Sequence, residues 1–467
     1  MAVFSIIKLS ELEGAKRIDA EYYKPEYLDL ISNLKIQKSK LLKELADKIF
    51  SGPFGSTLKS ESYQKQGIPF IRIGDISDIF IDKSNLVYIS PEEHKRIYST
   101  HLNPGDIVFS KIGTIGRLSV ISEDLGQVNI SENNIGIRLS KLSLQEKVSL
   151  LFFLLSKYGQ LQILRCASGN IQEKLNVADI ESVKVPIFST QFQQELWNLY
   201  EKITELQKQS QSLYSQAENL LLEELGLKDF KPRYKKTYTA NLSDAFSVHR
   251  IDAEYFQPAY EEVVERIKKY PNGFSRLLEY VENVKPDFDP TKCPEKTFSY
   301  VELANIDASI GTIHSVNEIK GEEAPSRAKR ILKDKDVVVS SVEGSLEKVA
   351  LIDKEHNGCL ASTGFFQFRP LDILPEVLLI LSKTIVLQSQ FKKKCSGTIL
   401  TAVPKESLRD IIIPLLPLST QQKIASLVQQ SHEARKKAKE LLEEAKRSVE
   451  IAIEKNEDEA LDYLNKF

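Results

Sequence analysis

Apolar and polar residues alternate along this chain with two different spacings. Residues 45–190 and 277–418 contain short β-branched runs such as IPFIRIGDI and VVVSSVEG, separated by Gly, Pro, Asn and Asp. Such runs are typical of strands joined by turns. From 192 and again from 420, apolar residues recur in steps of three and four, which predicts long amphipathic helices. The pattern therefore predicts two β-rich domains, each followed by a helix.

Both predicted helices carry a heptad seam of about four repeats. In the first helix the seam consists of Leu196, Leu199, Ile203, Leu206, Ser210, Leu213, Ala217 and Leu220. In the second, 228 positions later, it consists of Ile424, Leu427, Ser431, Ala434, Ala438, Leu441, Ala445 and Ser448. Large residues on one seam and small ones on the other favour two helices that pack closely together. The alternative is that each helix lies separately on its own domain.

The chain contains an internal repeat. RIDAEYY (17–23), followed by Pro25 and Tyr27, recurs 233 positions later as RIDAEYF (250–256), followed by Pro258 and Tyr260. Further matched segments are 70–76 with 300–306, 105–110 with 335–340, 168–169 with 396–397, 180–186 with 408–414, and 193–194 with 421–422. Because two copies are too few for a solenoid, the repeat predicts a pseudo-dimer in one chain, with a pseudo-twofold axis.

The fold class predicted is α+β, with two tandem, pseudo-twofold-related, β-rich mixed domains joined by two long antiparallel helices that form a coiled coil. Four segments follow. They are 1–190 (N-terminal helix and first domain), 191–230 (central helix), 231–418 (linker helix and second domain) and 419–467 (C-terminal helix).

Length and composition agree with a soluble protein of two or three domains. The 467 residues are 42% hydrophobic and 27% charged, and no apolar run approaches the roughly 18 residues of a membrane span. We expect a cytoplasmic protein, because no secretion signal is present and Cys166, Cys293, Cys359 and Cys395 show no paired spacing. The net charge of −2 counts mildly against nucleic-acid binding, although a local basic face is compatible with it.

Catalytic motifs are absent from the sequence. It contains no GxxxxGK[ST], GxGxxG or HExxH, and no Asn/Asp-Pro-Pro-aromatic motif of a methyltransferase. Asp287 and Glu295 loosely resemble a nuclease cluster, but Thr297 stands where the lysine belongs. We therefore expect no enzyme activity, no cofactor and no metal.

Two loops carry the remaining polar signals. Residues 51–59 (SGPFGSTLK) and 111–117 (KIGTIGR) combine small flexible residues with cations. Such loops bring backbone N–H groups, hydroxyls and a positive charge close to an anion, and Arg or Lys can also reach guanine edges. The alternative is that they are ordinary tight turns.

The order of these segments resembles the specificity subunits of type I restriction–modification systems. The resemblance rests on RIDAEYY, GPFGS before GIPFIRIGDI, PGDIVFSKIGTIGR, and a Pro-containing strand before a QQ-starting helix. It covers essentially the whole chain. It implies two target-recognition domains, about 40–190 and 277–418, and spacer helices, about 191–226 and 419–466.

The resemblance also implies function and partners. The chain would direct two methyltransferase subunits to a bipartite site on double-stranded DNA, with no membrane involved; whether restriction (nuclease) subunits join stays open. Residues expected at the DNA are Ser51, Phe54, Ser56, Lys59, Arg72, Lys111, Thr114 and Arg117 in the first domain, and Lys285, Ser340, Ser341, Ser345 and Lys348 in the second. The second domain has VKPDF where the first has GPFGS.

Two other classes of function compete with this interpretation. One is a coiled-coil scaffold whose two β-rich domains bind proteins, which a salt-sensitive DNA gel shift would distinguish. The other is a nuclease or methyltransferase in its own right, against which the missing motifs count.

Overall fold

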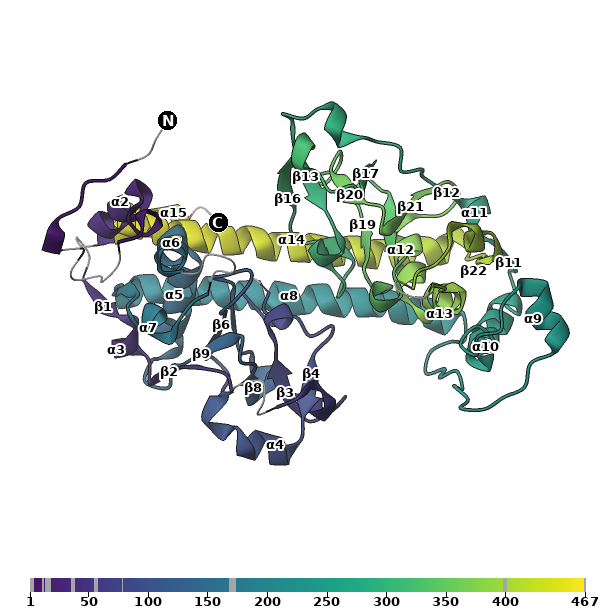
Figure 1. Cartoon of the computed structure of the whole chain (residues 1–467), viewed down its shortest axis with the longest axis horizontal. Helices are drawn as coiled ribbons and strands as arrows, with labels where there is room; N and C mark the ends of the chain where they lie inside the picture. Colours follow the sequence, from purple (N-terminus) through teal and green to yellow (C-terminus); the bar gives the residue numbers. More distant parts are fainter. Residues whose placement is uncertain are drawn as a thin grey trace. The chain divides into compact units, whose positions relative to one another are not determined.

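The computed structural model of the chain describes residues 4–10, 12, 18–34, 38–53, 58–77, 79–167, 174–397 and 401–465 (Figure 1). It contains two compact units. Unit 1 comprises residues 1–205 and 437–467, and unit 2 comprises residues 206–436.

Unit 1 contains two four-stranded sheets and a small two-stranded one. The first sheet has the order β2-β9-β6-β7, with β2 Lys48–Ser51, β9 Asn134–Arg138, β6 Ile107–Ser110 and β7 Leu118–Val120. The second has the order β4-β3-β8-β5, with β4 Val87–Ile89, β3 Ile68–Ile71, β8 Val128–Ile130 and β5 His101–Leu102. The small sheet pairs β1 Ser39–Leu41 with β10 Lys184–Pro186.

Unit 2 repeats this topology strand for strand. Its first sheet has the order β12-β21-β18-β19, with β12 Val281–Asn283, β21 Phe365–Pro370, β18 Val337–Ser340 and β19 Val349–Leu351. Its second has the order β16-β13-β20-β17, with β16 Asn317–Lys320, β13 Thr297–Val301, β20 Leu360–Ser362 and β17 Ala328–Ile331. The small sheet pairs β11 Phe274–Arg276 with β22 Ile412–Pro414, and a hairpin pairs β14 Ile306–Asp307 with β15 Thr312–Ile313. The predicted duplication is confirmed.

Short helices accompany the sheets. Unit 1 has α2 Pro25–Leu34, α3 Leu42–Leu45, α4 Pro91–Arg96, α5 Leu144–Leu155, α6 Lys157–Cys166, α7 Val177–Glu181 and α15 Glu457–Leu464. Unit 2 has α9 Leu242–Val248, α10 Pro258–Lys268, α11 Leu277–Tyr280, α12 Pro375–Lys383 and α13 Ile385–Lys394. Within the described ranges, none of the helices is both long enough and apolar enough to cross a membrane.

The sequence of β18 shows why the first sheet is central in unit 2. Val337, Val338 and Val339 are all fully buried. Val337 and Val339 join the core formed with α12 and the long helices, whereas Val338 joins the core shared with the second sheet. Because successive side chains of a strand point to opposite faces, a continuous apolar run fits a sheet that is covered on both faces.

Matched turns precede the central strand of each unit. Gly105 and Lys335 both adopt the left-handed conformation, with φ of 82° and 69°. Asp106 and Asp336, the next residues, are buried and accept hydrogen bonds from Asn103 N–H and Lys333 N–H. Because the same turn is built with Gly in one copy and Lys in the other, the duplication extends to backbone detail.

The two long helices are α8 (Thr190–Glu224) and α14 (Leu418–Glu454). In unit 2 they lie side by side and antiparallel (Figure 1), and the Ser210 and Ser431 hydroxyls are 3.2 Å apart. In unit 1 the residue before α8, Ser189, donates to Glu457 beyond the end of α14, which is also an antiparallel arrangement. The predicted antiparallel helix pair is confirmed.

The predicted heptad seam of α8 consists of two alternating sets of residues, and only one set is buried as predicted. Leu196, Ile203, Ser210 and Ala217 are fully buried, while Leu199, Leu206, Leu213 and Leu220 are only half-buried. Tyr214 and Leu221, which the heptad omits, are buried instead. A straight helix has 3.6 residues per turn, so its apolar stripe drifts away from a 3.5-residue seam, and α8 also packs against a globular core.

The described parts of the repeated motif pack on the two β-rich domains. The Arg165 guanidinium of α6 lies 3.8 Å from the centroid of the Tyr22 ring. In unit 2 the arginine comes from the motif itself. The Arg250 guanidinium lies 4.5 Å from the centroid of the Tyr255 ring and donates to the carbonyl of Cys395, just beyond α13. The motif thus anchors the chain to α6 and α13, and Arg17 lies outside the described residues.

Candidate DNA interface

In unit 1, two strand ends bring a hydroxyl and a cation together. Ser51 ends β2 and Lys111 directly follows β6, and the Lys111 ammonium donates to the Ser51 hydroxyl over 3.0 Å. Gly52 is required here because a Cβ would lie 2.0 Å from the carbonyl oxygen of Ser131. The predicted residues Phe54 and Ser56 of the same loop lie outside the described residues.

The loop 111–117 is a tight turn with an exposed tip. Gly113 and Gly116 have φ of 78° and 86°, a region that favours glycine, and the Gly116 carbonyl accepts a hydrogen bond from Gln160 of α6. Ile115 is buried, while Thr114 and Arg117 are exposed. The segment is therefore a tight turn that presents a hydroxyl and a guanidinium to solvent, and its contact with DNA stays a prediction.

Two further predicted cations of unit 1 differ in availability. Lys59 is exposed next to the buried Leu58. Arg72 is bound internally, since it donates to both carboxylate oxygens of Asp75 and to the carbonyl of Asn85. Burial raises the pKa of Asp75, and the Arg72 charge offsets this only in part.

In unit 2 the matching loop uses its hydroxyls internally. Ser340 is fully buried, and its hydroxyl lies 3.0 Å from that of Ser345 and accepts from Val342 N–H. Ser341 is half-buried and donates to the carbonyl of Gly364. Lys348 donates to the carbonyl of Ile306 over 3.0 Å. These groups stabilise the turn, and Ser340 presents no surface to a ligand.

Exposed cations of unit 2 gather instead beside the segment that follows β12. Lys285 is exposed there, and three residues on, Phe288 N–H donates to the carbonyl of Lys329. Lys329 and Arg327 are also exposed, and the carbonyl of Arg327 binds Thr363 N–H next to Gly364, the partner of Ser341. Sequence analysis missed Arg327 and Lys329, although the run RAKR (327–330) was an available signal.

Unit 1 has one further cation that sequence analysis missed. Lys174 is exposed and forms a β-bridge with Ile112, directly beside Lys111. Its counterpart in unit 2 is Ala402, which forms the matching bridge with Val342. Lys174 follows the repeated Ser-Gly pair at 168–169, and that repeat was the signal in the sequence.

The two loop clusters therefore differ in charge. Lys111 and Lys174 in unit 1 correspond to Ser341 and Ala402 in unit 2, whereas Arg117 corresponds to another cation, Lys348, which is bound to the carbonyl of Ile306. Lysine and arginine side chains supply most contacts to phosphates and guanine edges. Within unit 1 the cations converge on the turn after β6, whereas unit 2 places its cations around the edge strand β17.

The described residues contain neither a metal-ligand cluster nor a disulfide. Across the described ranges, no group of three or more His, Cys, Asp or Glu side chains is placed to hold a metal ion. The four cysteines form no disulfide. Two copies of a two-sheet domain on paired long helices, each with polar loops at its strand ends, define a duplicated binding protein.

Comparison with protein families agrees with this class. Residues 36–213 and 288–447 match the family described as type I restriction modification DNA specificity domain, once in each half of the chain. The chain belongs to this family. It is accordingly a DNA specificity subunit, and the members of this class are non-catalytic.

Individual relatives span different parts of the chain. The chain is 27% identical over 161 residues to the type I restriction enzyme EcoBI specificity subunit of Escherichia coli, a match that covers 34% of this chain and 32% of that protein. It is 23% identical over 448 residues to a protein of Methanocaldococcus jannaschii named as the type I restriction enzyme MjaX specificity subunit, covering 92% and 96%.

Solved structures of specificity subunits are also similar to the chain. The S subunit of a type I restriction–modification system from M. genitalium gives a TM-score of 0.35 at 14% identity, covering 91% of this chain and 95% of that one. The HsdS subunit from Thermoanaerobacter tengcongensis gives 0.27 at 14%, covering 91% and 96%. Scores this low support no inference about the present chain.

Proposed function

We propose that this specificity subunit reads a bipartite DNA target, with one half-site for each unit, and directs methyltransferase subunits to it in the cytoplasm. The observation that supports this most is the strand-for-strand duplication with divergent loops. Shared topology gives two domains of one kind, while the replacement of Lys111 and Lys174 by Ser341 and Ala402 gives them different ligand chemistry. Two similar domains with different contact groups suit two different half-sites.

The residues proposed at the DNA are at least partly exposed and lie at the loop clusters described above. In unit 1 they are Ser51, Lys59, Lys111, Thr114, Arg117 and Lys174. In unit 2 they are Lys285, Arg327 and Lys329. Arg72, Ser341, Ser345 and Lys348 are bound internally, and we assign them to support of the loops.

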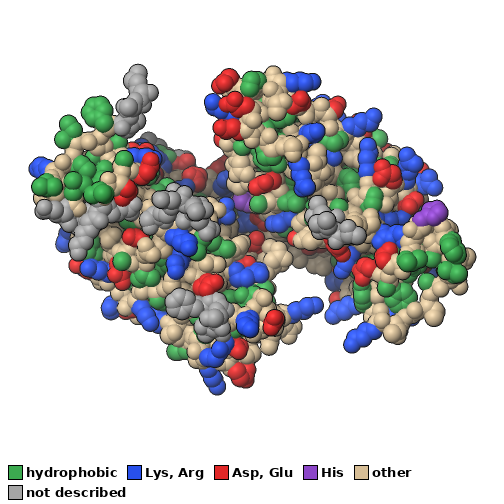
Figure 2. All heavy atoms as spheres, viewed as in Figure 1, with side chains coloured by type: hydrophobic (Ala, Val, Ile, Leu, Met, Phe, Trp, Pro, Cys, Tyr) green, Lys and Arg blue, Asp and Glu red, His purple; other side chains and the backbone are tan. Residues whose placement is uncertain are grey.

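Two methyltransferase subunits are proposed as partners because each unit repeats an exposed apolar segment. Leu9 and Ile18 in unit 1 are 70% and 90% exposed, and their counterparts Leu242 and Ile251 in unit 2 are 68% and 90% exposed. Figure 2 shows hydrophobic side chains gathered over the α9 region, where Phe246 is also exposed. Exposed apolar patches commonly mark protein interaction sites.

The first prediction concerns stoichiometry. The purified complex should contain two methyltransferase copies for each chain, measured by native mass spectrometry. Changing Ile251 to Asp should release one copy and leave the other bound, since Ile18 is unchanged. A complete complex with one methyltransferase, or loss of both copies from the single variant, would contradict the proposal.

The proposed function is tested by mapping methylated bases in the source genome with and without this gene. One motif of two short half-sites and a fixed gap should lose its methylation on deletion and regain it on complementation. An unchanged methylation map, or a continuous motif, would overturn the proposal.

The alternative of a protein-binding scaffold predicts a different result. A DNA gel shift with the methyltransferase complex should show binding that weakens steeply with salt, because cations that neutralise phosphates release counterions. A scaffold would give no shift that depends on the sequence.

A further inference from the structure

The hairpin β14–β15 of unit 2 is wedged between the recognition domain and its two long helices. Ile310, at the turn, is fully buried in the core that also contains Tyr214 of α8 and Val428 of α14. Gly311 is so close to α12 that a Cβ there would lie 2.6 Å from Leu379. The hairpin therefore lies at the joint between domain and helices.

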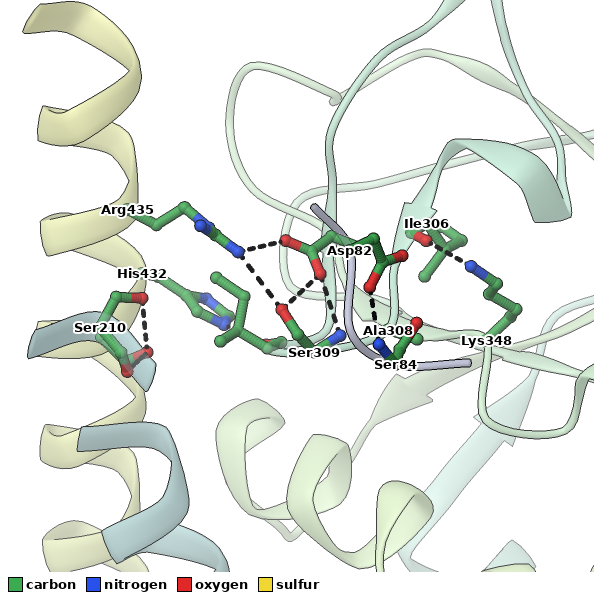
Figure 3. A network of polar contacts seen from close by, with 12 residues as sticks. Asp82, Ser84, Ser210, Ile306, Ala308, Ser309, Lys348, His432 and Arg435 are labelled. Carbon is green, nitrogen blue, oxygen red and sulfur yellow. Dashed lines mark hydrogen bonds and ion pairs between the residues drawn. The ribbon is translucent and has the colours of Figure 1, made fainter. Parts of the chain in front are cut away.

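Two side chains of α14 bind the hairpin directly (Figure 3). Arg435 donates to Asp307 Oδ2 over 2.7 Å and to the Ser309 hydroxyl over 3.3 Å. His432 Nε2 lies 2.8 Å from the carbonyl oxygen of Ile310, which fixes the tautomer as the Nε2–H donor. Two side chains of α14 thus donate to the hairpin, one to a carboxylate and one to a backbone carbonyl.

Two lysines of the domain donate to two further backbone carbonyls of the hairpin. Lys383, at the end of α12, donates to the carbonyl of Ala308 and lies 4.9 Å from the centroid of the Tyr214 ring. Lys348 donates to the carbonyl of Ile306 over 3.0 Å. The carbonyls at 306, 308 and 310 are therefore each bound by a different side chain.

The ion pair is maintained by its surroundings. Burial pushes the pKa of Asp307 upward, but the Arg435 charge and the hydrogen bonds from Ser309 outweigh it and hold the pKa below its ordinary value. Asp307 is thus a charged, largely buried carboxylate whose binding depends on Arg435. Removing one partner of such a pair leaves an uncompensated charge in a largely buried place, so the pair holds the hairpin to α14.

Unit 1 replaces four of these five anchors. The residues that match Asp307, Lys383, His432 and Arg435 are Ser77, Leu155, Thr204 and Gln207, whereas Lys348 is matched by Arg117, which is exposed. The matching loop contacts α8 by aromatic rings instead, with the Phe80 centroid 6.0 Å from that of Tyr200. The loop consequently contacts its helix by polar interactions in unit 2 and by aromatic rings in unit 1.

We propose that the side chains that bind the β14–β15 hairpin fix the orientation of the second recognition domain on its helices. These side chains, here called the clamp, are Lys348, Lys383, His432 and Arg435. Arg435 and its partner Asp307 are then positioning residues for the spacing of the two half-sites. This inference rests on the proposed bipartite function. Of the side chains that bind the hairpin, Lys348 alone was predicted at the DNA, and its ammonium is bound to the carbonyl of Ile306. Loosening the clamp should weaken the preference for the native gap and leave the bases read in each half-site unchanged.

The test measures methylation rates of the full complex on DNA whose half-sites are kept while the gap is one base pair shorter, native or one longer. Arg435→Gln should lower the preference for the native gap by about tenfold, the size of effect expected for coupled buried pairs. Asp307→Asn should act alike, and the double variant should be no worse than either single one. Arg435→Lys, which keeps the charge, should lie between.

Lys268→Gln serves as the matched control, because Lys268 forms an exposed ion pair with Glu265 in the same unit. It should leave the gap preference unchanged. Unchanged gap preference in Arg435→Gln, or an equal loss of rate on every substrate, would overturn the clamp proposal. If the wild-type complex shows no gap preference at all, the bipartite function itself fails, and the two results are therefore distinguishable.

Discussion

Single residues decide what each loop can bind. Lys111 and Lys174 lie on neighbouring segments of unit 1, and Arg117 extends from the same turn. In unit 2 the corresponding turn is held by Ser340 and Ser345. Ser341 and Ala402 stand in place of the two lysines, and Lys348, the counterpart of Arg117, donates to the carbonyl of Ile306. Loops of one origin have therefore become, in one case, a cationic tip and, in the other, a hydroxyl-bonded turn.

The second prediction belongs to this scale. Lys59→Ala should weaken binding to all DNA sequences. It should also make the slope of log binding constant against log salt concentration shallower by about one, as for one lost phosphate contact. Arg117→Ala should instead cost about 1–3 kcal/mol at one base position if it reads a base edge. The measurement is a binding titration at several salt concentrations on matched and substituted sites.

Lys141→Ala is the control, because Lys141 is exposed and paired with Asp47 elsewhere in unit 1. If neither Lys59→Ala nor Arg117→Ala changes the affinity or its salt dependence, both loops are turns only.

At the scale of elements, the contact of His432 on α14 with the hairpin should make the free energy of unfolding depend on pH. Burial lowers the pKa of His432, and its hydrogen bond to Ile310 offsets this only in part. The folded chain therefore keeps His432 neutral at a pH where the unfolded chain binds a proton. Stability is thus fully present above the ordinary value of about 6.5 and is lost as the pH falls from there towards the folded pKa.

The third prediction is that His432→Gln reduces this loss. Urea unfolding at pH 7.5 and pH 5.5 should show a smaller difference in the free energy of unfolding for the variant than for the wild type. Part of the dependence should remain, because burial also lowers the pKa of His101 in unit 1. An identical pH dependence in both proteins would show that His432 is not kept neutral by the fold.

At the scale of the whole molecule, the two long helices bear on the spacing of the proposed half-sites. The 35 residues of α8 span roughly 50 Å at about 1.5 Å per residue. Recognition domains that read one face of B-DNA are centred about one helical turn, roughly 34–36 Å, apart. Helices of this length are sufficient as a spacer between two such domains.

The fourth prediction tests the spacer. One heptad inserted at matched places in α8 and α14 adds about 10 Å, or about three base pairs. Methylation mapping should show the gap lengthened by about that amount with the same half-sites. A fixed gap, or altered half-site sequences, would contradict the spacer. Together with Arg435→Gln, which should broaden the gap preference without moving it, the insertion separates helix length from domain orientation.

The sequence by itself determined the duplication, the alternation of β-rich domains with helices, and the antiparallel helix pair, because repeats and apolar periodicity are local patterns that survive divergence. Only the tertiary structure decided which polar residues are available. Ser340 and Arg72 occur in the same kind of loop segment as Ser51 and Lys59, yet Ser340 is fully buried and the Arg72 guanidinium is bound by Asp75. The clamp joins Asp307 to Arg435 across 128 positions, and Tyr214 is buried outside the heptad because α8 packs against a core as well as a helix. Such contacts depend on which segments fold side by side, and no local pattern carries that information.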